Sequence, residues 1–253
     1  MYGIANLSIV PIRSEARDGS EQVSQLLFGE TFLVLEQNKQ WTKIQCVFDA
    51  YEGWIDTKQF LALTEEQFLK LDKFDKKFNT NLVEFLTKAN NELTTIVLGA
   101  DVTSTQPDAL DINIYSFDGD STEGIKAKNN LIKTALLYLN SPYLWGGKSP
   151  FGIDCSGFTQ MVYKLNGYKL YRDAYQQAEQ GEPLSFIEES EPGDLAFFDN
   201  EDGKITHVGI LMNDNYIIHA SGKVRIDRLD HLGIYNVDNG KHTHKLRVIK
   251  KII

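Results

Sequence analysis

The sequence predicts a multidomain protein, with all-β barrels at the N-terminus followed by an α+β domain whose helices pack on an antiparallel sheet. Residues 1–63 contain short apolar runs separated by turn residues such as Gly29, a pattern typical of a small barrel. Residues 125–253 begin with apolar residues at helical spacing and end in several strand-like runs. Helices followed by consecutive strands indicate an α+β domain.

Residues 64–124 connect these two regions. The stretch "TEEQFLKLDKFDKKF" has apolar residues at helical spacing among charged ones, and this spacing predicts a connector helix. The stretches "TTIVLGADV" and "DINIYSFDG" read as strands, and Pro107 lies in a polar loop between them. We therefore predict a connector helix and a second, degenerate barrel module.

Residues 125–253 divide into a helical part and a strand part. Three helices are predicted: one that stops at Pro142, one over "GFTQMVYKLNG" that closes at Gly167, and a short one over "RDAYQQAEQG". Five strands are predicted after them: "LAFFD", "THVGILM", "YIIHAS", "KVRIDRL" and "KLRVIKKI".

Net charge, apolar runs and the number of cysteines limit the binding partners and the cellular location that we expect. The net charge of -9 and the absence of a Lys/Arg cluster argue against a nucleic-acid partner. No apolar run is long enough to span a bilayer, and the first residues do not read as a signal peptide. Two cysteines are no disulfide framework, so we expect a cytoplasmic protein without a membrane partner. A chain trimmed of its leader would look the same.

Cys155 is the strongest candidate for a reactive residue. Small and capping residues, Gly152 and Asp154, precede it, and a helical run follows, so the thiol lies in the first turn of a helix. The partial positive charge at a helix N-terminus favours the thiolate, which is the nucleophile. The alternative is a small buried apolar residue, the usual fate of a free cysteine. Cys46 lies in mid-strand, and we assign it to packing.

A nucleophilic cysteine needs a base and a group that orients the base. His207 opens one predicted strand and His219 closes the next, with the turn signal "NDN" between them. A hairpin folded at Asn213 and Asp214 places the two histidines nearly opposite each other, on one face. The sequence therefore predicts that one imidazole hydrogen-bonds the other.

The remaining histidines make weaker sites. His242 and His244, in "HTH", share one face of a strand, and a metal is conceivable there, but two ligands make a weak site and a solvated surface is preferred. His231 has no evident partner in the sequence. No phosphate loop or dinucleotide fingerprint is present, so no cofactor and no metal are predicted.

Two sets of motifs resemble known families. "SEQVSQLLFGE" and "DAYEGWIDTKQF" are similar to bacterial SH3 domains. "SPYLWGGKSPFGIDCSGFTQ", "RDAYQQA", "EPGDLAFFD", "THVGILM" and "YIIHASGKVRID" resemble, in order, the papain-like NlpC/P60 cysteine peptidases. The resemblance implies that Cys155 attacks, that His207 is the base and that His219 orients it.

The combination of modules resembles the γ-D-glutamyl-L-diamino acid endopeptidases known as dipeptidyl-peptidase VI. It implies cleavage of murein peptides with a free N-terminal L-Ala, between D-Glu and L-Lys or meso-diaminopimelate, in wall recycling or turnover. The substrate contacts that it implies are Tyr143, Asp154, Ser156, Glu21 and Tyr51. Glu15 rivals Glu21 for the amine. Ala174 stands where relatives carry serine, which puts contacts to the D-glutamyl carboxylate in doubt.

Three alternatives stay open at this point. The first is a general hydrolase of intact peptidoglycan, the second is a thiol acyltransferase on the same scaffold, and the third is an inert wall-binding protein. The complete set of Cys155, His207 and His219 speaks against the inert reading. The SH3-like modules and the lack of an apolar anchor favour peptide hydrolysis over acyl transfer.

Overall fold

The computed structural model describes residues 1–110 and 115–253, and these form two compact units. The N-terminal unit comprises residues Met1–Ile125 together with Trp145–Pro150. The C-terminal unit comprises Lys126–Leu144 and Phe151–Ile253. The three predicted domains, residues 1–63, 64–124 and 125–253, stay a prediction.

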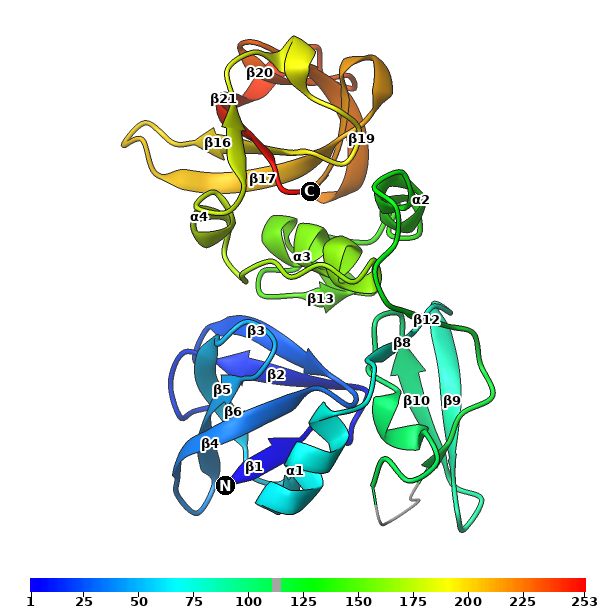
Figure 1. Ribbon diagram of the computed structural model, residues 1–253. Coiled ribbons are helices and arrows are strands. Elements are labelled where there is room, and N and C mark those ends of the chain that lie inside the picture. Colours follow the sequence, from blue (N-terminus) through cyan, green and yellow to red (C-terminus); the bar gives the residue numbers. More distant parts are fainter. Residues whose placement is uncertain (111–114) are drawn as a thin grey trace. The chain divides into compact units, whose positions relative to one another are not determined.

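The first part of the N-terminal unit is an antiparallel sheet of seven strands in the order β3-β2-β6-β5-β4-β1-β7 (Figure 1). Its strands are β1 (Tyr2–Ile4), β2 (Ile9–Arg13), β3 (Gln22–Leu27), β4 (Thr31–Gln37), β5 (Trp41–Cys46), β6 (Glu52–Asp56) and β7 (Leu61–Leu63). The predicted SH3-like barrel is confirmed. Thr42, Ile44 and Cys46 point inward from alternate positions along β5, and Cys46 joins the apolar core, so its assignment to packing is confirmed.

Gly29 forms the predicted turn between β3 and β4. Its φ of +81° lies in the left-handed region, and a Cβ added there would stand 1.8 Å from the carbonyl oxygen of Asp101. Only glycine allows this close approach between two parts of the N-terminal unit.

The rest of this unit is built from short elements: α1 (Glu65–Asp72), β8 (Lys77–Asn79), β9 (Val83–Lys88), β10 (Leu93–Val97), the 3₁₀ turn η1 (Thr103–Thr105), β11 (Tyr115–Ser116), β12 (Ser121–Glu123) and β13 (Lys148–Ser149). Helix α1 is the predicted connector, and it starts at a capping box between Thr64 and Gln67. Of the strand predicted over "DINIYSFDG", residues 111–114 lie outside the described residues.

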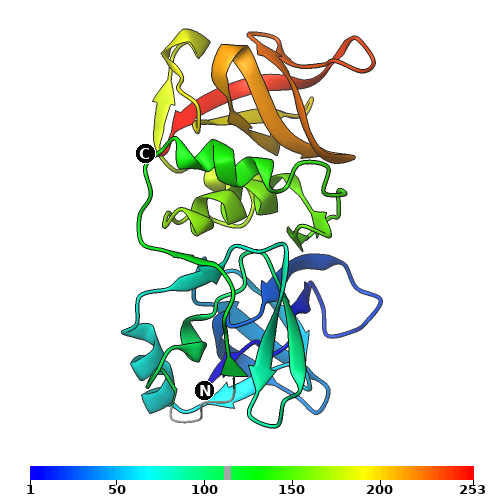
Figure 2. The ribbon, with the colours of Figure 1, turned by 90° about the vertical axis from the view of Figure 1, so that its right-hand side faces the viewer.

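The C-terminal unit contributes α2 (Asn130–Leu136), β14 (Gly152–Ile153), α3 (Cys155–Leu165) and α4 (Ala174–Gln177). All eleven residues of α3 are buried, and Figure 2 shows α2 beside it, on one side of the sheet. The three predicted helices are present; α2 and α4 are shorter than the predicted stretches, and α3 begins at Cys155, two residues before "GFTQMVYKLNG". Among the residues that the structure describes, no helix has the length and apolar character needed to cross a membrane.

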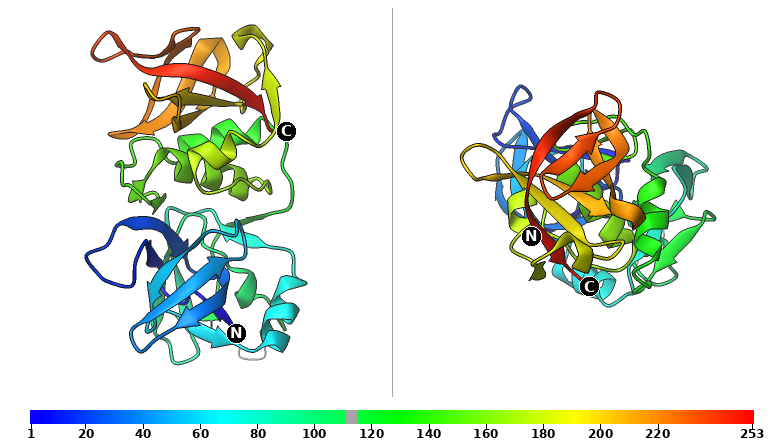
Figure 3. Two further views of the ribbon diagram at one scale, coloured as in Figure 1. Left: turned by 90° about the vertical axis from the view of Figure 1, so that its left-hand side faces the viewer. Right: turned by 90° about the horizontal axis from the view of Figure 1, so that it is seen from above.

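The sheet of this unit closes on itself (Figure 1). Its order is β15-β21-β16-β17-β18-β19-β20, and β20 pairs back with the long β21, drawn in red in Figure 3. The strands are β15 (Glu182–Leu184), β16 (Leu195–Asp199), β17 (Ile205–Leu211), β18 (Tyr216–Ser221), β19 (Lys223–Asp230), β20 (Gly233–Asn236) and β21 (Lys241–Lys251), with the 3₁₀ turns η2 (Ile187–Glu189) and η3 (Asn213–Asn215). The five predicted strands are present. The short β15 and β20 escaped prediction, and Pro183 fits β15 because it is an edge strand.

Candidate active site

Cys155 is the first residue of α3, and a buried ion pair fixes this helix start. The Asp154 side chain caps the helix by accepting a hydrogen bond from the Gly157 N–H at 2.6 Å. The buried Arg172 guanidinium donates to both Asp154 carboxylate oxygens, at 3.0 and 2.6 Å. A bidentate pair of this kind has a fixed geometry. The backbone that carries the thiol is therefore held rigidly.

The thiol lies against the backbone of β17 on both sides of His207. Its Sγ is 4.0 Å from the carbonyl oxygen of Thr206, and the Val208 N–H also hydrogen-bonds the sulfur. Cys155 is thus brought to the strand that carries the predicted base.

The helix N-terminus favours a Cys155 thiolate, but the burial of the side chain acts against it. Burial raises the pKa of the thiol to about 12, and the neighbouring Asp154 carboxylate adds to the rise. The Val208 N–H and the Arg172 guanidinium act in the opposite direction without reversing it. A thiol with a raised pKa needs a base to take its proton before it can act as a nucleophile.

The two predicted histidines are in contact, but their strand register differs from the prediction. His219 lies opposite Gly209, two residues from His207, because η3 forms a three-residue turn with Asp214 and Asn215 at positive φ. Gly209 leaves room at this point, since a Cβ there would stand 2.8 Å from the His219 Cβ. The His207 Nε2 and the His219 Nδ1 are 2.8 Å apart, so the predicted hydrogen bond is confirmed.

Sequence reasoning missed Asp227, which extends this chain of hydrogen bonds. The His219 Nε2 lies 3.0 Å from the Asp227 Oδ2, and both side chains are buried. Arg225 pairs with His219 across β18 and β19, and Asp227 follows two residues later on the same face. Hairpin pairing through the turn at Gly222 was the signal that could have found it.

Burial lowers the pKa of His207 well below 6.5, and the neighbouring His219 and His244 act in the same direction. Burial also lowers the pKa of His219, although Asp227 opposes this. Burial alone would raise the pKa of Asp227, but hydrogen bonds from His219, Arg225 and the Val237 N–H outweigh it and lower that pKa to about 2. Both imidazoles are therefore neutral at pH 7, beside an ionised carboxylate.

His244 is not the solvated surface residue that the sequence predicted. Its ring stacks on the His207 ring, with 4.1 Å between centroids and 25° between planes. Burial lowers its pKa to about 4. His242, in contrast, is exposed and hydrogen-bonds Asp230 at 2.9 Å. Within residues 1–110 and 115–253, no group of three or more histidines, cysteines and carboxylates is arranged to hold a metal.

Tyr143 lies beside the start of α3, as its predicted role requires. It forms a parallel bridge with Ile153, and its N–H donates to the Gly222 carbonyl at 3.0 Å. Burial raises the pKa of the phenol to about 12, and the nearby Cys155 and Asp154 raise it further. The phenol therefore keeps its proton and can act as a donor.

The other predicted substrate contacts lie in two places. Asp154 and Ser156 are buried, and both side chains bind Arg172. In the N-terminal unit, the Glu21 Oε1 accepts a hydrogen bond from the Trp145 indole N–H at 2.6 Å. Tyr51 packs half-buried against the barrel core. The contacts of these four residues with substrate stay predictions.

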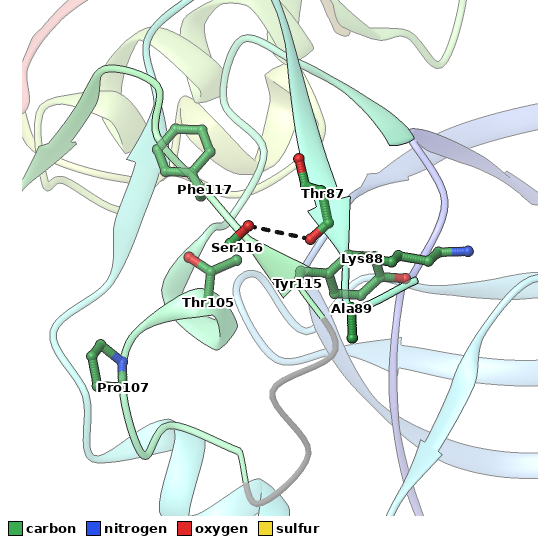
Figure 4. A pocket seen from close by; sticks show the side chains of 8 residues that line it. All are labelled: Thr87, Lys88, Ala89, Thr105, Pro107, Tyr115, Ser116 and Phe117. Atoms are coloured by element: carbon green, nitrogen blue, oxygen red, sulfur yellow. Dashed lines mark hydrogen bonds between the residues drawn. The ribbon is translucent and has the colours of Figure 1, made fainter. Parts of the chain in front are cut away.

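Two further groups of residues lie apart from the predicted catalytic histidines. Glu15, the rival of Glu21, forms an exposed ion pair with Arg17 at 2.8 Å. A cavity of about 350 Å³ in the N-terminal unit contains none of the predicted site residues (Figure 4). Its lining consists of Thr87, Lys88, Ala89, Thr105, Pro107, Tyr115, Ser116 and Phe117.

Comparison with known proteins identifies both parts of the chain. Residues 140–248 match the NlpC/P60 family, and residues 12–60 match the bacterial dipeptidyl-peptidase Sh3 domain. A solved NlpC/P60 family protein from Bacillus cereus has the same fold, with a TM-score of 0.81 at 20% identity over 100% of this chain and 99% of that one.

Two named relatives agree with these matches. The γ-D-glutamyl-L-lysine dipeptidyl-peptidase of Bacillus subtilis is 28% identical over 221 residues, 78% of this chain and 71% of that protein. The dipeptidyl-peptidase 6 of Lysinibacillus sphaericus is 40% identical over 108 residues, 41% of this chain and 37% of that protein. The chain carries an NlpC/P60 domain together with a bacterial SH3 domain, and it is a cysteine peptidase of the cell-wall class.

Proposed function

We propose that this protein hydrolyses the bond between γ-D-Glu and an L-diamino acid in cell-wall peptides that begin with a free L-Ala. The observation that carries the proposal is the placement of the Cys155 thiol against β17, beside the hydrogen-bonded His207, His219 and Asp227. The B. subtilis relative named for γ-D-glutamyl-L-lysine peptides supports the choice of bond.

The reaction begins from a neutral thiol and a neutral imidazole, as the raised pKa of Cys155 and the lowered pKa of His207 require. His207 takes the thiol proton while Sγ attacks the γ-carbonyl carbon of D-Glu. The C–N bond then breaks as His207 passes its proton to the leaving amine, which leaves a thioester on Cys155. Water, deprotonated by His207, hydrolyses this thioester and restores the free thiol.

We assign Tyr143 and the backbone of residues 154–156 to the developing oxyanion. The Tyr143 phenol keeps its proton and lies near Cys155, so it can donate as negative charge develops on the carbonyl oxygen. The rigid helix start held by Asp154 and Arg172 fixes the backbone N–H groups beside the nucleophile. Donors fixed before the reaction do not have to reorganise in the transition state.

We assign the substrate amine to carboxylate and hydroxyl groups, because a buried ammonium without partners is costly. Glu21 is the first choice, since its carboxylate is exposed and is held through one oxygen by the Trp145 indole N–H. Tyr51, Asp154 and Ser156 complete the proposed set. Ala174 lacks a hydroxyl, so we expect a weak hold on the D-glutamyl carboxylate. The cytoplasmic location stays a prediction.

The test is liquid chromatography with mass spectrometry on defined wall peptides. L-Ala-γ-D-Glu-L-Lys and its meso-diaminopimelate counterpart should yield L-Ala-D-Glu and the free diamino acid, and N-acetylated versions should not react. Cys155→Ala should abolish both products. Equal rates on free and acetylated peptides, or release of peptides from intact wall, would favour a general hydrolase. Transfer to an added amine without hydrolysis would favour an acyltransferase.

A matched pair of variants tests the amine contact. Glu21→Ala should raise KM with little change in kcat, because the amine lies away from the reacting carbonyl. Glu15→Ala removes a carboxylate of the same barrel that is bound to Arg17, and it should change neither constant. A rise in KM for Glu15→Ala alone would transfer the amine contact to that residue.

A further inference from the structure

Hydrogen-bond donors surround the carboxylate of Asp227. Its Oδ2 accepts from the Arg225 Nε at 2.7 Å, and its Oδ1 accepts from the Arg225 Nη2 at 2.9 Å and from the Val237 N–H at 3.0 Å. The side chain is fully buried. These three N–H donors hold the carboxylate ionised, and an ionised carboxylate can only accept hydrogen bonds. The remaining partner, the His219 Nε2 at 3.0 Å, must therefore be a donor as well.

This requirement fixes the protons on both imidazoles. A neutral His219 with its proton on Nε2 carries a lone pair on Nδ1. The atom that faces this lone pair, at 2.8 Å, is the His207 Nε2, which must donate. A neutral His207 with its proton on Nε2 carries its lone pair on Nδ1. Both histidines are neutral at pH 7 because burial lowers their pKa values.

We propose that Asp227 is a positioning residue that acts through His219 to make Nδ1 of His207 the atom that accepts the Cys155 proton. The assignment of His207 as the base of Cys155 rests on the proposed function, whereas the proton pattern itself follows from the hydrogen bonds alone. The opposite pattern would need a proton on Asp227 that points at His219. The pKa of Asp227, about 2, excludes that proton at neutral pH.

The substitution Asp227→Asn separates the charge from the shape of this side chain. With its oxygen at the Oδ2 position, the asparagine would point its amide N–H groups at Arg225 and Val237, which are donors themselves. With its oxygen at the Oδ1 position, the amide would donate to the His219 Nε2 and meet only the Arg225 Nε as a competing donor. The second orientation is favoured because it leaves fewer donors facing each other. Because the asparagine amide then donates to the His219 Nε2, the proton of His219 must lie on Nδ1. The His219 Nδ1–H donates to the His207 Nε2, so the proton of His207 lies on its Nδ1.

The matched control is Asp230→Asn. Asp230 lies three residues further along β19, and its carboxylate binds the exposed His242 at 2.9 Å, so it is a second aspartate–histidine pair on the same strand. This pair does not contact the catalytic histidines. Its loss should leave the tautomers of His207 and His219 unchanged.

The experiment is NMR of the protein labelled with ¹⁵N-histidine at pH 7, where the protonated and bare ring nitrogens of neutral imidazole have well-separated shifts. We expect the wild type and Asp230→Asn to show His207 and His219 protonated on Nε2, and Asp227→Asn to show both protonated on Nδ1. Wild-type His207 protonated on Nδ1 would overturn the proposal, and this result needs no folded variant. So would unchanged tautomers in a folded Asp227→Asn protein.

Activity provides a second, separable readout. On the peptides described above, Asp227→Asn should lower kcat by about 10²–10⁴-fold with KM nearly unchanged, because a misplaced proton removes general-base catalysis without touching the substrate. A fall in activity that appears only in KM would overturn the proposal. The wild-type protein could show the expected tautomers and still cleave none of the peptides. That result would refute the proposed function but would leave the proposed proton pattern intact.

Discussion

Each of the two units of this protein contains one cysteine, and the two thiols are buried to nearly the same extent. Cys46 is 7% exposed in the barrel of the N-terminal unit, and Cys155 is 6% exposed in the C-terminal unit. The Cys46 side chain belongs to an apolar core with residues such as Ile44 and Phe32. The Cys155 side chain lies at a helix start, against β17 and near a carboxylate, a guanidinium and a phenol. Burial therefore does not distinguish the packing thiol from the proposed nucleophile, whereas the polar neighbours of Cys155 do.

The largest expected effect is the difference in activity between variants of the two cysteines. Cys155→Ala should lower kcat/KM by more than about 10⁴-fold, because a nucleophile has no substitute. Cys46→Ala should keep the wild-type rate and lower the free energy of unfolding by roughly 1 kcal/mol, the cost of a small change in a packed core. Kinetics on the tripeptide and urea unfolding measure the two effects. A Cys46→Ala protein that is folded but inactive would refute the assignment.

The second prediction ranks the histidines beside Cys155. His207→Ala should lower kcat by at least about 10²–10⁴-fold, since it removes the base. His219→Asn should retain measurable activity, because an amide can still accept a hydrogen bond from the His207 Nε2–H. Steady-state kinetics of the two variants give the ranking. The reverse order would mean that the base and its orienting partner have been exchanged.

A pair of tyrosines tests the phenol near Cys155. Tyr143→Phe should lower kcat by about 10²–10³-fold, the range for one oxyanion donor. Tyr138→Phe is the matched control, because the Tyr138 hydroxyl is buried without a hydrogen-bond partner. Removing that hydroxyl should leave kcat unchanged and the protein no less stable. Unchanged kinetics for Tyr143→Phe would leave this residue with a packing role only.

The smallest expected effect is the pH dependence of stability. His207, His219 and His244 all have folded-state pKa values below 6.5. As the pH falls below about 6.5, the unfolded chain binds protons that the folded protein does not, so the folded state loses stability. Each neutral histidine contributes up to about 1.4 kcal/mol per pH unit.

Urea unfolding at pH 7 and pH 5 measures this slope. We expect a lower free energy of unfolding at pH 5 and a smaller decrease in His244→Phe, which keeps a ring on His207 and removes one titrating group. Stability that is constant or rises from pH 7 to pH 5 would contradict the assigned protonation states.

The sequence predicts the elements well and the long-range contacts poorly. The strands "LAFFD" and "YIIHAS" match β16 and β18 residue for residue, because bounded apolar runs are a local signal. The pairing of β17 with β18 is shifted by one residue from the predicted register, because the turn has three residues, two of them at positive φ, where two were predicted. His244 was missed because it lies on the closing strand β21, whose pairings with β16 and β20 contain register shifts that no local pattern reveals.

The pKa of the Cys155 thiol is a second property that depends on long-range packing and so could not be predicted from the sequence. Its helix-start position is visible in the sequence, and the associated dipole favours the thiolate. The cost of burial is larger and depends on how α3 packs against β17, which the sequence does not display. The helix-start position of Cys155 was therefore predictable, whereas the effect of burial on its pKa was not.

The most direct test of the difference between the two thiols is the rate at which each is alkylated by iodoacetamide at pH 7, followed by peptide mapping. We expect Cys155 to react before Cys46 in the wild type, because His207 can take its proton. In His207→Ala, the rate at Cys155 should fall while the rate at Cys46 stays the same. Preferential labelling of Cys46, or a Cys155 rate that does not depend on His207, would contradict the account.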